Sequence, residues 1–212
     1  MLVVVEETNA GEHRALLENM FRLRARVFRD RLKWDVVVED GMERDRYDDL
    51  GPVYLIYTDE EQKQVKGSLR LLPTTGPTLV SEFFSDTMPA AAQLSAPAIW
   101  ECTRFCLDET LLDNGSRAEM TFASGVLFAG LGEIALRSGI ASILGNFDAG
   151  MYRLYRRIGC EVDVLGVTHR FERPVYLGLF PVSRPILDKV RARLGGRDRD
   201  LRLVGTSRLL AA

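Results

Sequence analysis

Charged and aromatic side chains gather between Arg24 and Asp48, and their types could bind a ligand that carries both charge signs. Basic residues and the aromatics Phe28 and Trp34 come first, and acidic residues follow. Arginine can donate paired hydrogen bonds to a carboxylate, an aromatic face can hold a cation, and a carboxylate can take a proton from an ammonium group. The acidic residues are Glu39, Asp40, Glu43, Asp45, Asp48 and Asp49. A solvated helix followed by a charged loop would give a similar pattern, because charge patterning alone is weak evidence.

Two later segments place charged residues inside apolar runs that read as strands. Arg70 lies between Leu69 and Leu71, and it needs an ionic partner if it is buried. The alternative is a surface arginine on an edge strand. Glu101 and Arg104 are three residues apart, so on a regular strand they point to opposite faces. Either they serve different sides of the sheet, or a β-bulge re-aims one of them.

Histidine and cysteine usage limits the chemistry. The chain has two histidines, which exclude a multi-histidine metal centre, and three cysteines without CxxC spacing, which argue against a zinc site or a disulfide framework. We therefore expect no metal, reduced thiols as in a cytoplasm, and acid–base work by carboxylates.

Length and charge exclude several classes of protein. A chain of 212 residues predicts one domain, or one domain with a tail. The net charge of -2 does not suit a nucleic-acid binder, no apolar run approaches the length of a membrane span, and no secretory signal is recognisable. We expect a cytoplasmic protein with neither nucleic acid nor membrane as a partner.

Hydrophobic periodicity predicts an alternation of strands and helices. Strands are expected at 2–5, 53–58, 65–72, 99–106, 140–147, 160–167 and 174–181, and helices at 11–30, 119–138 and 149–158. This order favours an α/β fold, a three-layer α-β-α sandwich with a mixed sheet. We expect residues 1–183 to form the domain and the arginine-rich residues 184–212 to form a partly ordered tail.

Taken in order, these residues resemble the acyl-homoserine-lactone synthases, the LuxI-type autoinducer synthases. The acids fall in G-M-E-R-D-R-Y-D, the strand arginine in G-S-L-R-L-L-P, and the second strand reads E-C-T-R-F from residue 101. Each match alone would be weak, but many in register are specific. The matched residues are Arg24, Phe28, Trp34, Glu43, Asp45, Asp48, Arg70, Phe84, Glu101, Arg104 and Phe105.

The resemblance implies a fold similar to the GNAT N-acyltransferases and a reaction between S-adenosylmethionine and an acyl thioester. S-adenosylmethionine is then a substrate, with no tightly bound cofactor. Its amine is acylated, and the product closes to a homoserine lactone and releases methylthioadenosine. Glu101 and Glu43 are the candidate bases, with Glu101 preferred because a strand positions it.

The resemblance also assigns binding roles. Phe28 and Trp34, which otherwise read as core residues, would cover the adenosyl and sulfonium groups, and Phe84 would lie in the following loop. The arginines Arg24, Arg70 and Arg104 would pair with Asp45 and Asp48 and hold the loop over the substrate.

The acyl chain would lie between the helix at 119–138 and the strand at 140–147. Gly145 and Phe147 stand where enzymes that make 3-oxo products often carry threonines, so a 3-oxo preference is not expected and Phe147 would reshape the site. Arg153, Arg156 and Arg157 match a basic helix that docks an acyl carrier protein, or they would meet the phosphates of acyl-CoA. An ordinary solvated helix face is the alternative.

Two other functions compete with the synthase. A GNAT-type acetyl-CoA-dependent N-acetyltransferase would carry a glycine-rich (R/Q)-x-x-G-x-(G/A) loop before the central helix, for which R-F-C-L-D-E-T is a poor substitute. A non-catalytic ligand-binding module would bind without turnover, but it would not explain paired acids beside the strand motif.

Overall fold

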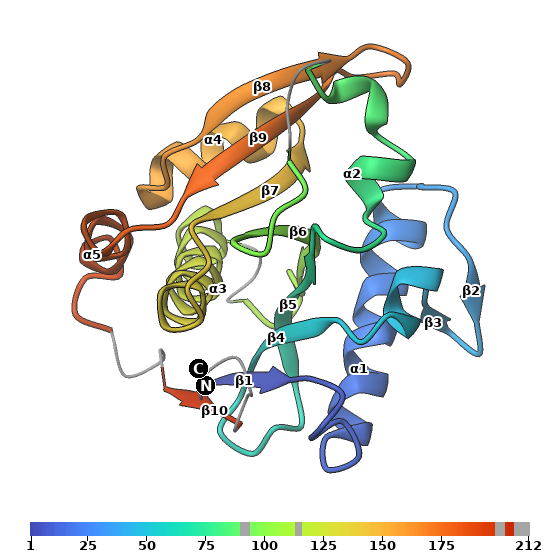
Figure 1. Cartoon of the computed structure of the whole chain (residues 1–212). Helices are drawn as coiled ribbons and strands as arrows, with labels where there is room; N and C mark the ends of the chain where they lie inside the picture. Colours follow the sequence, from blue (N-terminus) through green and yellow to red (C-terminus); the bar gives the residue numbers. More distant parts are fainter. Residues whose placement is uncertain (90–93, 113–115, 198–201, 206–212) are drawn as a thin grey trace.

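The computed structural model describes residues 1–89, 94–112, 116–197 and 202–205 (Figure 1). In this part of the chain, eight strands form one mixed sheet in the order β10-β1-β4-β5-β6-β7-β9-β8. The strands are β1 (Leu2–Val5), β4 (Val53–Thr58), β5 (Val65–Pro73), β6 (Ile99–Leu107), β7 (Ser142–Phe147), β8 (Asp163–Thr168), β9 (Val175–Pro181) and β10 (Leu203–Val204).

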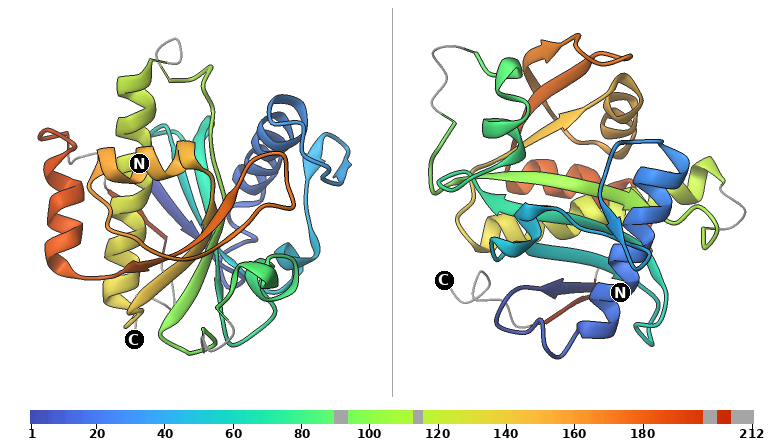
Figure 2. Two further views of the ribbon diagram at one scale, coloured as in Figure 1. Left: turned by 90° about the horizontal axis from the view of Figure 1, so that it is seen from above. Right: turned by 90° about the vertical axis from the view of Figure 1, so that its right-hand side faces the viewer.

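Helices cover both faces of this sheet, as Figure 2 shows from above. One face carries α1 (Arg14–Arg24), its π-helical continuation η1 (Ala25–Arg31), and the short α2 (Leu79–Glu82), which the 3-10 turn η3 (Ser85–Thr87) follows. The other face carries α3 (Arg117–Arg137), α4 (Ala149–Ile158) and α5 (Arg184–Ala192). The predicted three-layer α/β fold is confirmed.

The strand sequences explain why both faces are covered. In β4, Tyr54 and Ile56 pack beneath α1, while Leu55 and Tyr57 pack beneath α3. A strand buried on both sides reads as a continuous apolar run instead of alternating. The helix α3 differs from the expectation that no apolar run is long enough to span a membrane, because its length and composition alone would allow it. In the structure, however, 67% of its most apolar stretch is buried inside the protein. It is the central helix of the core.

The parallel strands β6 and β7 pair over only part of their length. Their register joins Ile99 to Ser142, Trp100 to Ile143, and Glu101 to Leu144. Both strands continue beyond this point, β6 to Leu107 and β7 to Phe147, without pairing to each other. We call the region beyond Glu101 and Leu144 the fork. Backbone groups of β6 and β7 that face each other there do not pair across the fork, so a ligand can satisfy them.

Two segments contain more regular structure than the sequence indicated. The predicted loop at 32–52 holds the hairpin of β2 (Val38–Glu39) and β3 (Met42–Glu43) and the 3-10 helix η2 (Arg46–Asp49). After residue 183, α5 packs on α3, and β10 pairs in parallel with β1. Residues 198–201 and 206–212 of the predicted tail lie outside the described residues, so the boundary at 183 stays a prediction.

Candidate active site

Arg24 ends α1 and binds two carboxylates from the segment that follows. Its Nε donates to Glu43 Oε2 over 2.5 Å, and its Nη1 and Nη2 donate to the two oxygens of Asp48 over 2.8 Å each. The Arg24 side chain is only 1% exposed. The helix end therefore fixes η2 through a two-pronged, charge-assisted contact.

Arg70 joins the same acids from the middle of the sheet. Its Nη1 donates to Asp45 Oδ1 over 2.5 Å and to Asp48 Oδ1 over 2.8 Å, and its Nε donates to Thr103 Oγ1 over 3.0 Å. The side chain is fully buried, and β5 lies between β4 and β6. The alternative of a surface arginine on an edge strand is therefore wrong.

Arg104 completes the set from β6. Its Nη2 lies 3.0 Å from Glu43 Oε1 and 2.7 Å from Asp45 Oδ2. We call these six residues the ion-pair network: Arg24, Glu43, Asp45, Asp48, Arg70 and Arg104. The described structure thus brings together the arginines and acids that the resemblance grouped, and it adds Glu43 as a partner of two of them.

A β-bulge places Arg104 there. The register between β5 and β6 shifts between Ser68 and Arg70, and Arg104 has a φ of 54°, in the left-handed region that non-glycine residues seldom occupy. The next residue, Phe105, points away and stacks near Phe128 of α3. The sequence left two possibilities for Glu101 and Arg104: side chains on opposite faces of the sheet, or a bulge that re-aims one of them. The structure confirms the bulge.

The ion-pair network balances its charges, which explains how it survives burial. Burial alone would raise the pKa of Asp48, but hydrogen bonds and the positive charges of Arg24 and Arg70 outweigh it and hold that pKa well below its usual range. The pKa of Arg24 is raised, because its carboxylate partners outweigh the opposing effect of burial. These six side chains tie α1, η2, β3, β5 and β6 into one unit.

Glu101 stands at the last paired position before the fork. Its Oε1 accepts from the backbone N–H of Val80 over 2.6 Å, and its Oε2 accepts from that of Leu79 over 3.0 Å, so it holds the start of α2. It is 1% exposed, and burial raises its pKa although these two N–H groups oppose the shift. A raised pKa brings a carboxylate nearer to the range that suits a general base.

Glu43, the other candidate base, is engaged differently. It is fully buried, with one oxygen on Arg24 and the other on Arg104. Among the described residues, each oxygen of Glu101 accepts one backbone hydrogen bond, which uses one of its two lone pairs, and no arginine pairs with it. The geometry therefore favours Glu101 over Glu43 for taking a proton.

The predicted aromatic residues lie in different surroundings. Phe28, in η1, is buried in the core on the α1 face of the sheet, while Trp34 is 51% exposed and stacks on Phe28 with ring centroids 5.0 Å apart. The guanidinium of Arg104 lies 5.4 Å above the Phe28 ring, so this aromatic pair adjoins the ion-pair network. Phe84 lies apart from the network, at the end of α2, and packs against Phe171 at 5.6 Å.

Aromatic rings fill the α3 side of the fork. Phe147 is buried against Tyr155 at 5.3 Å, and its ring covers Gly178 of β9, where a Cβ would come within 2.5 Å of it. Gly145 faces across the fork, since a Cβ there would lie 3.4 Å from the carbonyl oxygen of Cys102. We call the following rings the aromatic cluster: Phe105, Phe128, Phe147, Tyr155 and Phe180.

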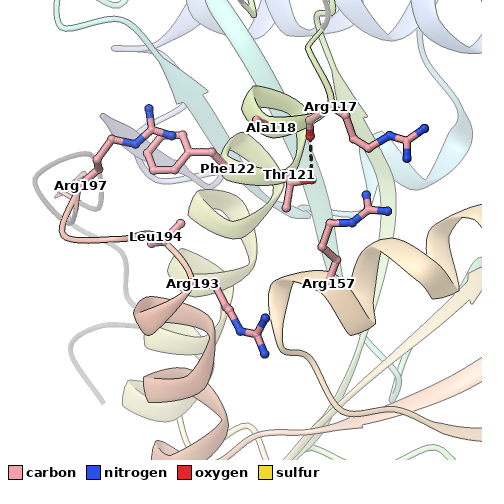
Figure 3. Close-up of a pocket in the computed structure, with 8 residues that line it drawn as sticks. All are labelled: Arg117, Ala118, Thr121, Phe122, Arg157, Arg193, Leu194 and Arg197. Atoms are coloured by element: carbon pink, nitrogen blue, oxygen red, sulfur yellow. Dashed lines mark hydrogen bonds between the residues drawn. The ribbon is translucent and has the colours of Figure 1, made fainter.

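The three arginines predicted for carrier docking are exposed on α4: Arg153, Arg156 and Arg157. Arg157 borders a hollow, which also involves Arg117 of α3 and Arg193 beyond α5 (Figure 3). These two partners were not predicted, because three segments far apart in the sequence meet there. Within the described ranges, no group of three or more His, Cys, Asp or Glu side chains is arranged to hold a metal ion.

A mixed sheet with a fork between β6 and β7 is a fold shared with N-acetyltransferases. A putative N-acetyltransferase from Lactobacillus plantarum superposes with a TM-score of 0.50 at 16% identity, covering 86% of this chain and 99% of that one. This likeness concerns the fold alone.

The family follows from closer matches. The family model for autoinducer synthase matches residues 8–190. An acyl-homoserine-lactone synthase from Rhizobium etli is 40% identical over 92% of this chain and 90% of its own length. The chain therefore belongs to the autoinducer synthase family, which confirms the resemblance seen in the sequence.

A solved structure of high similarity is that of a CoA-dependent acyl-homoserine lactone synthase, BjaI, with SAM and isopentyl-CoA. It superposes with a TM-score of 0.86 at 27% identity and covers 100% of this chain and 97% of that one. A second structure of the same synthase contains MTA.

Proposed function

We propose that this chain makes an N-acyl-L-homoserine lactone from S-adenosylmethionine and an acyl thioester and releases methylthioadenosine. The observation that carries the proposal is the family match over residues 8–190. It is supported by solved structures of the similar synthase BjaI, one with SAM and isopentyl-CoA and one with MTA.

S-adenosylmethionine binds on the α1 side of the fork. Trp34 offers an exposed aromatic face beside Phe28, and such a face attracts a cation like the sulfonium. The ion-pair network positions this segment without contributing a reacting group, because its charges already neutralise one another. Phe84 borders the site from the α2 side.

In the first step, Glu101 takes a proton from the α-amine of S-adenosylmethionine. An α-amine has a pKa of about 8 in water, so most of it is protonated and not nucleophilic at neutral pH. The freed nitrogen attacks the thioester carbonyl, the carbon–sulfur bond breaks, and the thiol leaves with a proton. Backbone N–H groups that face the fork stabilise the oxyanion that forms on the way.

In the second step, the carboxylate of the acylated product attacks its own γ-carbon. The new C–O bond forms as the bond to the sulfonium sulfur breaks, and the electron pair neutralises the sulfur of methylthioadenosine. No proton moves, so the protein has only to hold the chain in a folded-back conformation.

The acyl group lies on the α3 side of the fork, against Gly145, Phe105 and Phe147. Because the aromatic cluster fills this region, it favours a short or branched acyl group over a long straight one. Neither Gly145 nor Phe147 can donate a side-chain hydrogen bond to a 3-oxo group.

The acyl donor reaches the fork as a thioester of coenzyme A or of an acyl carrier protein in the cytoplasm, and the arginines of α4 attract either one. Mass spectrometry of lipid extracts from cells that express the chain tests the function. An N-acyl-homoserine lactone absent from control cells is expected. If no such lactone accumulates with any supplied fatty acid, the proposed function is wrong.

A further inference from the structure

A hollow of about 530 Å³ lies between three helical segments on the α3 side of the sheet. The first turn of α3, the last turn of α4 and the segment after α5 form its walls, as Figure 3 shows. The side chains that matter are Arg117, Phe122, Arg157, Arg193, Leu194 and Arg197. Its volume falls in the range of sites for small molecules.

Three of the four arginines around this hollow have no carboxylate partner among the described residues. In the part of the chain that the structure describes, Arg117, Arg157 and Arg193 form no ion pair. Arg197 differs, because it lies 3.1 Å from Glu119. Guanidinium groups that gather without carboxylates create a positive potential that attracts anions, and their planar forks suit phosphate oxygens.

The floor of the hollow is apolar. Phe122 and Leu194 are both buried, and the guanidinium of Arg197 stacks 3.4 Å above the Phe122 ring. A planar guanidinium can also stack on a flat heterocycle. The hollow therefore suits a ligand that combines several phosphates with a planar base, which is the chemistry of a nucleotide and not of a protein surface.

Two of the helices that border the hollow, α3 and α4, also carry rings of the aromatic cluster. Phe122 and Phe128 lie six residues apart on α3, which is about 9 Å along a helix axis, and Phe128 belongs to the aromatic cluster. On α4, Arg157 follows Tyr155 of the same cluster by two residues. A ligand held in the hollow by its phosphates could extend a flexible arm along α3 and α4 to the fork.

We propose that this hollow binds the phosphates and the adenosine of coenzyme A, so that the acyl donor is an acyl-CoA. This inference rests on the proposed synthase function and names its donor. Arg117, Arg157 and Arg193 bind the phosphates, and Arg197 stacks on the adenine.

Binding of coenzyme A itself, measured by calorimetry, tests the site without any turnover. The variants are Arg157→Ala, Arg193→Ala and the double variant R117A/R193A. The control is Arg173→Ala, which removes an exposed arginine that is not part of the hollow. Each single variant should raise the Kd of coenzyme A about tenfold, as expected for losing a charge-assisted hydrogen bond. The control should bind like the wild type.

Kinetics then separate this site from the fork. The same variants should raise the KM for acyl-CoA by a similar factor, with the kcat and the KM for an acyl-pantetheine unchanged, since the latter lacks the nucleotide. Dephospho-CoA, which lacks the 3′-phosphate, should bind the wild type more weakly than coenzyme A does. The substitutions should also raise its Kd by a smaller factor.

Two outcomes would overturn the inference. In one, the double variant binds coenzyme A as tightly as the wild type. In the other, Arg156→Ala raises the KM for an acyl carrier protein donor, while the hollow variants leave the KM for every acyl donor unchanged. That result would show that the donor binds at the outer face of α4. Both outcomes leave lactone formation intact, whereas failure of the proposed function would remove it with every donor.

Discussion

Arginines on the two sides of the sheet have contrasting surroundings. On the α1 side, Arg24 and Arg70 are buried, Arg104 is mostly covered, and each binds two carboxylates. On the α3 side, Arg117, Arg157 and Arg193 are exposed around a hollow, and none of them forms an ion pair in the described ranges. The comparison suggests that arginines neutralised within the protein hold its shape, while those left unpaired at a concave surface bind an anionic ligand.

The largest expected effect comes from removing a buried arginine on the α1 side, and it is a loss of free energy of unfolding. Arg70→Ala leaves the buried Asp48 and the partly exposed Asp45 with one positive partner fewer, and removal of one partner from a buried ion pair costs about 3–5 kcal/mol. Urea unfolding should show this loss together with loss of activity. Arg173→Ala, at an exposed position, should stay within about 0.5 kcal/mol of the wild type. An Arg70→Ala protein as stable as the wild type would show that the network is not architectural.

The next effect concerns catalysis at the fork. Glu101→Gln removes the proton acceptor, and loss of a general base lowers turnover about 10²- to 10⁴-fold. Because glutamine keeps one oxygen for the N–H of Val80, the fold should be retained by circular dichroism, and the activity lost should not return when S-adenosylmethionine is raised. Turnover near that of the wild type would transfer the role of base to Glu43 or to water.

The ion-pair network should also make stability depend on pH. The folded pKa of Asp48 is depressed, so its carboxylate stabilises the fold above the unfolded pKa of about 3.9. This contribution is lost as the pH falls below that value toward the folded pKa. Unfolding free energies measured between about pH 5 and pH 2 should therefore fall steeply in the wild type and less steeply in Asp48→Asn. Equal slopes would mean that Asp48 is not held ionised by its arginines.

A smaller change concerns the acyl group. Phe147→Leu shortens one ring of the aromatic cluster, which should cost about 1 kcal/mol of stability and open space beside Gly145. The ratio of kcat/KM for longer over shorter acyl donors should rise several-fold. Competition between two acyl-CoA chain lengths, read by mass spectrometry of the lactones, measures this ratio. An unchanged ratio would place the acyl chain elsewhere.

The smallest expected effect is at Trp34, which is half exposed and outside the core. Trp34→Ala should raise the KM for S-adenosylmethionine about threefold to tenfold, in line with a single cation–π contact. Stability and the KM for the acyl donor should stay as they are. Trp34→Phe keeps an aromatic face and should recover most of the affinity.

The sequence predicted the α1 side of the site better than the α3 side. Arg70 inside an apolar strand needed a partner if it was buried, and the resemblance to the synthase family paired it with Asp45 and Asp48. The sequence offered the bulge at Arg104 only as one of two alternatives, because a change of register depends on the neighbouring strand.

The hollow could not be predicted, because Arg117, Arg157 and Arg193 are far apart in the sequence and become neighbours only when α3, α4 and α5 pack. A signal for α5 was nevertheless present. Leu187, Val190 and Leu194 are spaced for one helix face, and Ser183 and Pro185 suit a helix start. The arginine-rich composition of this segment concealed that period.

The most direct test of the whole account is the stoichiometry of products from the purified chain. Incubated with S-adenosylmethionine and an acyl-CoA, it should release methylthioadenosine, free coenzyme A and N-acyl-homoserine lactone in equal amounts. Free coenzyme A together with an acylated amine, but without methylthioadenosine, would contradict the account, because it would show acyl transfer to a different acceptor.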